Sequence, residues 1–155
     1  MDAKPRTWYG TLGLCVAVLA ACGDSLTGPE AADPRVVEFV ELLNDHRVDV
    51  GCPVLEWHGA AAEVAEAHSA DMIARNYFAH TNPDGDSPFD RMTNAGISYS
   101  GAAENIAYGY YDAASVLQAW IDSPGHRANI ENCALRQHGV GLVDTHWTHL
   151  FLTTP

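Results

Sequence analysis

Apolar residues recur at helical spacing in three stretches of this chain, and strand-like segments replace them near the C-terminal end. In residues 36–43, 61–72 and 113–121 the apolar residues stand three or four positions apart, as on one face of a helix. Residues 140–143 and 147–152 are instead rich in β-branched, aromatic and aliphatic residues, and the connection between them suits a hairpin. Helices that precede a terminal hairpin predict an α+β fold, in which helices cover a small antiparallel sheet.

Capping and turn residues mark where these elements begin and end. Residues 33–34 (Asp-Pro) are typical of a helix start, and residues 51–53 (Gly-Cys-Pro) end the first helix. Residues 87–90 (Ser-Pro-Phe-Asp) resemble a capping box and predict a further short helix. Residues 123–125 (Ser-Pro-Gly) are expected to end the last helical stretch, and residues 99–108 before it are predicted to be extended.

The N-terminal segment has the features of an export signal. Residues 1–21 contain the basic residues Lys4 and Arg6 and then a short apolar stretch, which is too short to span a bilayer as a mature helix. The stretch ends in Leu-Ala-Ala-Cys, which resembles the bacterial lipobox and predicts a lipoprotein signal peptide with a lipid on Cys22. The alternative is an ordinary secreted protein in which Cys22 has no such role.

One folded domain is expected to follow the signal. Residues 22–33 are polar and rich in Gly, Pro and acidic residues, so we expect the lipidated cysteine to be followed by a flexible tether. Residues 34–155 are enough for one hydrophobic core, and we expect a monomer. The formal net charge of −12 argues against binding to nucleic acid or to anionic lipid headgroups. Membrane contact is therefore predicted through the lipid alone, on an exported protein of the cell envelope.

The four cysteines of the chain separate into two groups. Cys15 would be removed with the signal peptide and Cys22 would carry the lipid. Cys52 and Cys133 remain, and in an oxidising compartment they favour a disulfide. Such a bond would close a loop of roughly 80 residues and stabilise the fold by about 4–5 kcal/mol in the chain-entropy model. A metal site that uses both thiolates is the alternative, although no Cys-x-x-Cys spacing supports it.

Four ionisable residues lie in turns or at the ends of predicted elements. They are His80, Asp90, Glu104 and His126, and they come from four separate segments. Two imidazoles with two carboxylates suit zinc and related divalent ions, and they equally suit general acid–base chemistry. Each also has a structural alternative, since Asp90 can cap its helix and the others can be hydrogen-bonded or helix-entry residues. Six further histidines are expected to be structural or exposed: His46, His58, His68, His138, His146 and His149.

Several short motifs follow one another along the chain in an order that is found in a known superfamily. They are His-Ser-Ala-Asp-Met at 68–72, Asn-Tyr-Phe-Ala-His-Thr-Asn-Pro-Asp-Gly at 76–85, Ser-Pro-Phe-Asp-Arg-Met at 87–92, Ala-Glu-Asn-Ile-Ala at 103–107, Ser-Pro-Gly-His-Arg-Ala-Asn-Ile at 123–130, Gly-Val-Gly at 139–141 and Trp-Thr at 147–148. Together they resemble the bacterial SCP-like extracellular proteins of the CAP superfamily, which also contains the cysteine-rich secretory proteins, antigen 5 and the pathogenesis-related proteins. The resemblance covers about residues 36–152.

The resemblance implies a three-layer α-β-α sandwich with a central cleft. Two histidines and two acidic residues line that cleft in the family, and they match His80, Asp90, Glu104 and His126. The two histidines can hold a divalent metal, often zinc. This sequence has Asp90 where many eukaryotic members have Glu, and Arg-Ala-Asn follows His126 in place of an aromatic-Thr-Gln sequence.

The expected function is a lipid-anchored CAP domain that binds a divalent cation, with zinc as the expected ion, and an unknown small-molecule, lipid or peptide ligand. Catalysis is not predicted, because the chain lacks the His-Glu-x-x-His and Gly-x-Ser-x-Gly motifs. One alternative is a metal-dependent hydrolase of peptides or cell-envelope components, with Glu104 and His126 as the candidate catalytic residues. Another is a lipid or sterol carrier, an activity of some eukaryotic members.

Overall fold

The computed structural model describes residues 28–29 and 32–155. The predicted signal peptide, Cys22 and most of the predicted tether lie outside these residues. Along residues 32–155 the elements are α1 (Pro34–Asp49), β1 (Glu56–Trp57), α2 (Gly59–Ala74), α3 (Pro88–Asn94), β2 (Gly101–Tyr108), α4 (Ala113–Asp122), α5 (Pro124–Ile130), β3 (Gln137–Val143) and β4 (His146–Thr153). None of the helices in this part of the chain is both long and apolar enough to cross a membrane.

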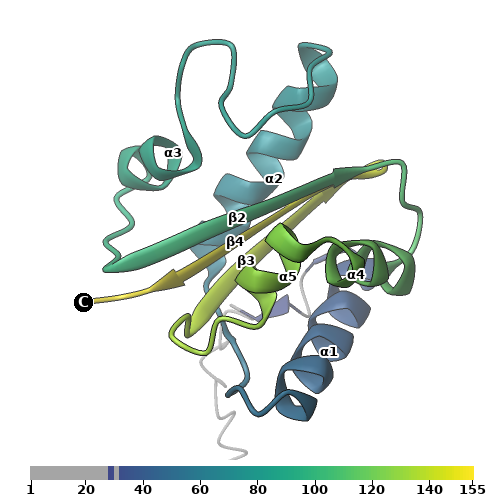
Figure 1. The fold of residues 1–155 in the computed structure, drawn as a ribbon. Coiled ribbons are helices and arrows are strands. Elements are labelled where there is room, and N and C mark those ends of the chain that lie inside the picture. The colour runs from purple at the N-terminus through teal and green to yellow at the C-terminus, as the bar shows by residue number, and fades with distance from the viewer. Residues whose placement is uncertain (1–27, 30–31) are drawn as a thin grey trace, which may run out of the picture.

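The elements form three layers, as the resemblance implied. Figure 1 shows the sheet between α2 and α3 on one face and α1, α4 and α5 on the other. The strand order is β1-β3-β4-β2, and β4 pairs antiparallel with both β3 and β2. The two-residue strand β1 pairs parallel with β3, so the sheet is mixed rather than purely antiparallel. The chain between β1 and β3 is long enough to allow this pairing, because it includes most of the domain.

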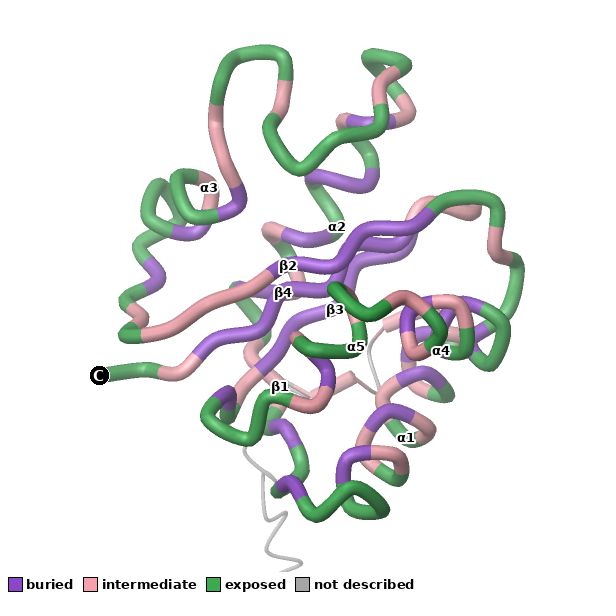
Figure 2. Tube along the Cα trace, viewed as in Figure 1, coloured by how far each residue is buried: buried purple, intermediate pink, exposed green. Residues whose placement is uncertain are grey.

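Strand β4 divides the core between the two faces of the sheet. Successive side chains of a strand point to opposite faces, and Trp147 and Phe151 pack with α1 and α4 whereas Leu150 and Leu152 pack with α2 and α3. Figure 2 shows that the buried positions are concentrated along the three long strands and on the faces of the helices that cover them. The predicted helical stretches therefore supply the core of both outer layers.

Helix α2 packs directly on the backbone of β3 at two glycines. A Cβ atom at Gly139 would overlap the backbone of Ala61 and Ala62, and one at Gly141 would overlap the backbone of Ala65 and Glu66. Small residues on α2 and glycine on β3 thus bring the helix axis close to the sheet. No larger residue fits at either glycine without separating the two layers.

Two local predictions need correction in detail. Residues 123–125 were expected to end a helix, with a helix entry at His126 as an alternative; Ser123 does cap the end of α4, and Pro124 also opens a second helix, α5. Proline at the first helical position is compatible with a helix start as well as with a preceding stop, and the sequence alone did not separate the two. The extended segment begins slightly later than expected, at Gly101.

The predicted disulfide between Cys52 and Cys133 is present. It joins the segment after α1 to the segment after α5 across a sequence separation of 81 residues, with a Cα–Cα distance of 4.9 Å. Arg47 lies buried nearby, and its guanidinium donates hydrogen bonds to carbonyl oxygens of both segments, including those of Pro53 and Leu135. The covalent bond and the buried cation therefore hold the same two segments together.

Two histidines without a matching motif are buried together in the core. His138 Nδ1 lies 3.0 Å from His149 Nε2, and the His149 ring packs against Phe39 and Phe151. Burial lowers the pKa of His138 to about 3 and lowers the pKa of His149 well below its usual range. Both imidazoles are structural, which agrees with the prediction from the sequence.

The contact between α2 and β3 predicts that Gly141→Ala will destabilise the fold strongly. The added methyl group overlaps backbone atoms that cannot rotate away, so we expect the free energy of unfolding to fall by at least about 2 kcal/mol. Urea denaturation measures the change. Gly101→Ala is the matched control, because a Cβ at Gly101 meets nothing within 4 Å. An equal effect of both substitutions would contradict the packing argument.

The buried imidazole pair predicts a loss of stability in mild acid. Both folded-state pKa values lie below the unfolded value of about 6.5, so the unfolded chain binds protons first as the pH falls. Each imidazole then costs about 1.4 kcal/mol per pH unit below 6.5, and for His138 this continues to about pH 3. Unfolding measured between pH 7.5 and 5.5 should show a flatter pH dependence for His138→Leu/His149→Leu than for the wild type or for His46→Gln.

Candidate functional site

The candidate site lies across β2, the edge strand of the sheet. The adjacent residues Glu104 and Asn105 point to opposite sides of this strand, as the two-residue repeat requires. Glu104 contacts His80 and Arg91 on the side of α2 and α3, whereas Asn105 contacts His126 and Asn129 on the side of α5. Both outer layers therefore contribute to one site at the edge of the middle layer.

Glu104 is a buried carboxylate with a partner at each oxygen. His80 Nδ1 lies 2.8 Å from Oε1, and Arg91 donates a hydrogen bond of 2.6 Å to Oε2. The Glu104 side chain is 2% exposed, and the Arg91 side chain is 11% exposed. Arg91 also donates to the backbone carbonyls of His80 and Asp86. A single guanidinium thus links β2, α3 and the loop that carries His80.

The loop between α2 and α3 is held close to α2 by a second group of polar side chains. His68 Nε2 lies 3.0 Å from the carbonyl oxygen of Ala79, next to His80. The Tyr77 hydroxyl donates to Asp71 and lies 3.3 Å from His68 Nδ1. Burial lowers the pKa of His68 and, together with the hydrogen bond to Asp71, raises the pKa of Tyr77 well above its usual range. His68 is therefore the buried, hydrogen-bonded residue that the sequence predicted.

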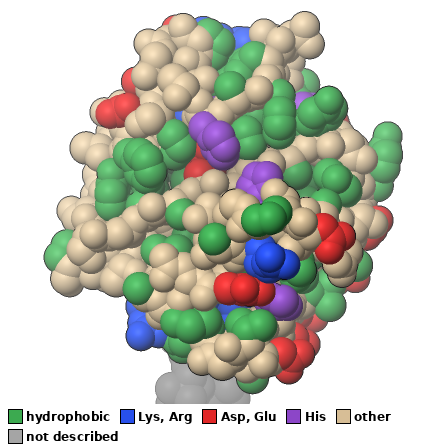
Figure 3. Space-filling model, in the orientation of Figure 1, with side chains coloured by type: hydrophobic (Ala, Val, Ile, Leu, Met, Phe, Trp, Pro, Cys, Tyr) green, Lys and Arg blue, Asp and Glu red, His purple; other side chains and the backbone are tan. Residues whose placement is uncertain are grey.

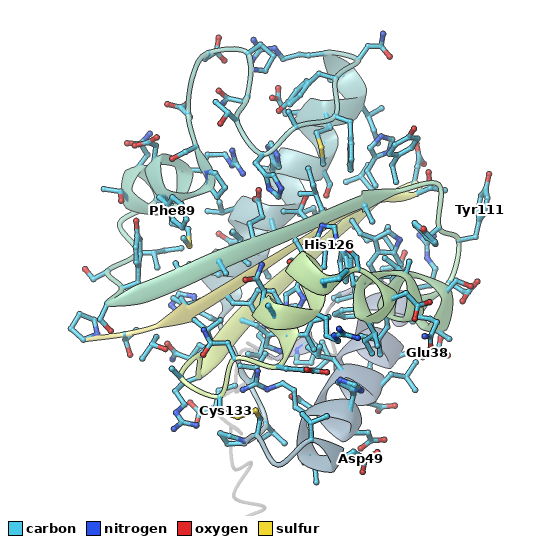
Figure 4. All side chains as sticks on the ribbon, viewed as in Figure 1. Glu38, Asp49, Phe89, Tyr111, His126 and Cys133 are labelled. Atoms are coloured by element: carbon cyan, nitrogen blue, oxygen red, sulfur yellow. A yellow bond between two sulfur atoms is a disulfide. The ribbon has the colours of Figure 1, made fainter. Side chains whose placement is uncertain are left out.

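His126 approaches the site from α5. Figure 4 shows it where α5 lies in front of β2. Its Nδ1 lies 2.9 Å from Ser123 Oγ, and its carbonyl oxygen accepts a hydrogen bond from Asn105. Burial lowers the pKa of His126, and the positive charge of a protonated His80 lowers it further.

Asp90 is the predicted site residue that the structure leaves apart from the others. Its carboxylate accepts hydrogen bonds from the backbone N–H and the hydroxyl of Ser87, which completes the capping box of α3. These hydrogen bonds lower the pKa of Asp90. The structure thus joins His80 to Glu104, adds Arg91 as the second partner of that carboxylate, and places His126 on the other side of β2 beside Asn105. A buried glutamate needs a cationic partner. This requirement is the signal in the sequence that could have indicated Arg91.

Two hollows adjoin the site. One, of about 250 Å³, lies beside His126 and Ser123 and is walled by Phe78, Tyr108 and Trp120. The other, of about 410 Å³, shares Phe78 and Tyr108 in its lining and continues along Asn76 and His146. Figure 3 shows two neighbouring histidine side chains near the centre of this face, with hydrophobic side chains around them. The site is therefore open to solvent and bordered by apolar groups.

The two imidazoles fit a metal ion in one respect and are insufficient in another. When Nδ1 of each ring donates its proton to Glu104 or Ser123, Nε2 keeps a free lone pair, which is the arrangement of metal-binding histidines. However, within residues 32–155 no three His, Cys, Asp or Glu side chains are grouped so that they could hold an ion. Both oxygens of Glu104 are engaged, so any further ligands would come from water or a bound molecule.

A three-layer sandwich whose cleft holds paired histidines beside a buried glutamate defines a class of secreted proteins. The Cysteine-rich secretory protein family, or CAP family, matches residues 40–151, and this chain belongs to that family. Its motifs from the His80 loop to the hairpin lie within the matched region.

Relatives and solved structures with the same domain come from several bacteria. The chain is 39% identical over 128 residues to the uncharacterized protein YkwD of Bacillus subtilis, with 81% of this chain and 50% of YkwD covered. It is 36% identical to the uncharacterized membrane protein YlbC of the same organism, with 74% of this chain and 33% of YlbC covered. The chain thus spans half or less of the curated relatives that it matches.

Solved structures agree with the fold. A crystal structure of an extracellular protein with an SCP domain from Bacillus anthracis has a TM-score of 0.74 at 35% identity and covers 76% of this chain and 39% of its own. An outer surface protein from Borrelia burgdorferi has a TM-score of 0.73 at 20% identity, with 78% of this chain and 93% of its own covered. At that identity the second comparison shows the shared fold alone.

The buried ion pair predicts that Arg91→Leu will be far more damaging than removal of both partners. Loss of the guanidinium leaves the Glu104 carboxylate buried without a cation, and we expect the free energy of unfolding to fall by about 3 kcal/mol or more. Arg91→Leu/Glu104→Leu should recover a large part of that loss, because no uncompensated charge remains. Urea denaturation of both variants measures this, and a double variant less stable than Arg91→Leu would contradict it.

Proposed function

We propose that this chain is an exported CAP domain, anchored through a lipid on Cys22, that binds a divalent cation between His80 and His126. Zinc is the favoured ion, because neutral imidazoles are among its preferred ligands. Export is supported by the signal-like residues 1–21, by the disulfide and by the extracellular relative from Bacillus anthracis. Lipid anchoring is supported by the sequence Leu-Ala-Ala-Cys at residues 19–22.

The observation that carries the metal proposal is the way each imidazole is oriented. His80 Nδ1 contacts a carboxylate and His126 Nδ1 contacts a hydroxyl, so each ring is held through one nitrogen and offers the other. Burial also favours the neutral form of His126, which is the form that binds metal. A bound ion would act there as a Lewis acid toward a ligand in the adjoining hollow.

Glu104 acts in this proposal as a positioning residue. Its oxygens accept from His80 and Arg91, so it orients the first imidazole and is in turn fixed by the guanidinium. The hydrolase alternative requires Glu104 to accept a proton from water. That role has less support, because neither oxygen is free to face a water molecule without the loss of one of these contacts.

The hollow beside His126 favours a small ligand. Its volume of about 250 Å³ lies below the range of roughly 300–1,000 Å³ that is usual for drug-sized ligands. A sterol would not be enclosed there. The lipid-carrier alternative therefore has little support from this site, and the proposed ligand is a small molecule or one end of a longer one.

The metal proposal predicts zinc binding that needs both histidines. We expect His80→Ala and His126→Ala each to weaken zinc binding at least tenfold, and the double variant to abolish it. Ser123→Ala should weaken it by about tenfold, because it removes only the partner that orients His126. Isothermal titration of the purified protein with zinc measures these affinities.

His46→Ala is the control for the zinc titration. His46 belongs to α1 and pairs with Glu131, away from the cleft, so its loss should leave zinc affinity unchanged. Wild-type affinity in the double variant His80→Ala/His126→Ala would refute the metal proposal.

A further inference from the structure

Two aromatic residues form an exposed ridge beside the histidines. Phe78 and Tyr108 are 44% and 59% exposed, and their ring centroids lie 4.8 Å apart at an angle of 62°. Tyr108 also stacks on His146, with the centroids 5.8 Å apart and the planes 22° apart. Contiguous apolar surface of this kind marks many interaction sites and ligand-binding grooves. The three rings therefore form one continuous aromatic surface.

The ridge separates two hollows that share it as a common wall. Phe78 and Tyr108 line both the hollow of about 410 Å³, which also contains Asn76 and His146, and the hollow of about 250 Å³ beside His126. A ligand longer than one ring could therefore lie across the ridge and occupy both sides. Its end in the smaller hollow would face the proposed metal site.

The chemistry of the two hollows favours an uncharged ligand. Among the described residues that line either hollow, none is Lys, Arg, Asp or Glu. The lining therefore offers no charged side chain to pair with a charged ligand, and the net charge of −12 repels anions. The polar groups that are present are amide, hydroxyl and imidazole groups, which exchange hydrogen bonds with neutral partners.

A peptide that adds as a strand is a poorer fit at this edge of the sheet. The outward carbonyl oxygens of β2 beside the site already accept hydrogen bonds from side chains of the α4 and α5 layer. Trp120 Nε1 donates to Ile106 at 3.3 Å, and Asn129 donates to Glu104 at 3.5 Å. Strand addition depends on such backbone groups being free, so the edge cannot offer a regular ladder at these positions.

We propose that the Phe78–Tyr108 ridge and its two hollows bind a neutral oligosaccharide. The C–H face of a sugar ring is electropositive and packs on the electronegative face of an aromatic ring. The sugar hydroxyls would then exchange hydrogen bonds with Asn76, Ser123 and the imidazoles at the rim. This inference rests on the proposed function in that it names the ligand class of the same cleft.

The test is titration of the purified protein with two neutral probes, N-acetylchitotetraose and cellotetraose, followed by tryptophan fluorescence and calorimetry. Trp120 lines the smaller hollow and reports on its occupation. We expect saturable binding of at least one probe. Tyr108→Ala and Phe78→Ala should each weaken it at least fivefold, because stacking on these rings supplies much of the contact.

Tyr111→Ala is the matched control, since Tyr111 is 76% exposed and lines neither hollow. Absence of saturable binding of both sugars to the wild type at millimolar concentration would overturn the inference. Equal weakening by Tyr111→Ala and Tyr108→Ala would overturn it as well, and so would displacement of both sugars by a neutral peptide or a fatty acid that binds far more tightly.

Zinc titrations of the same variants separate this inference from the metal proposal. Phe78 and Tyr108 are not among the proposed ligands, so zinc affinity should stay within twofold in both variants. If the protein binds zinc but neither sugar, the oligosaccharide proposal alone is refuted. Zinc binding that fails while the sugars still bind refutes the metal proposal alone.

Discussion

The direct packing of α2 on β3 is the contact on which the rest of the structure depends. Gly139 and Gly141 leave room for the helix backbone itself, so α2 sits closer to the sheet than side chains would permit. The loop after α2 then passes near the edge strand β2, and its residue His80 reaches Glu104. Because α3 follows that loop, the same placement brings Arg91 to the buried carboxylate. The cleft is thus a consequence of how closely two layers approach.

The second layer completes the cleft through shorter-range contacts. Asn105 holds the backbone of His126, and Asn129 holds Asn105, so α5 is fixed to the opposite side of β2 from His80. His80 and His126 therefore lie on opposite sides of one strand, each oriented by its own hydrogen-bond partner. Both oxygens of Glu104 are engaged, one by His80 and the other by Arg91. The exposed ridge of Phe78 and Tyr108 extends the site along the same strand and loop.

Much of the fold and of the candidate site could be predicted from the sequence where the determining contacts are local. The caps of α1 and α3 follow from Asp33 and Ser87, which bond to backbone groups two or three residues away. The family motifs indicated His80, Glu104 and His126 as a set, and the count of cysteines favoured the bond between Cys52 and Cys133. By contrast, Asp90 was expected in the cleft, yet Ser87 in its own helix turn satisfies its carboxylate. An aspartate that caps a helix and an aspartate that lines a binding site cannot be distinguished from a single sequence.

The sequence by itself determined the order and type of most elements, the family and the disulfide, and it predicted three residues as members of the cleft, because these follow from periodicity, capping chemistry, the cysteine count and linked motifs. Only the tertiary structure decided that Arg91 balances Glu104, that His138 and His149 form a buried pair, and that Phe78 and Tyr108 form one ridge. Each of these contacts joins residues that are 11 to 30 positions apart and lie on different elements. Such contacts depend on how the layers pack, and the pattern of residue types along the sequence does not specify that packing.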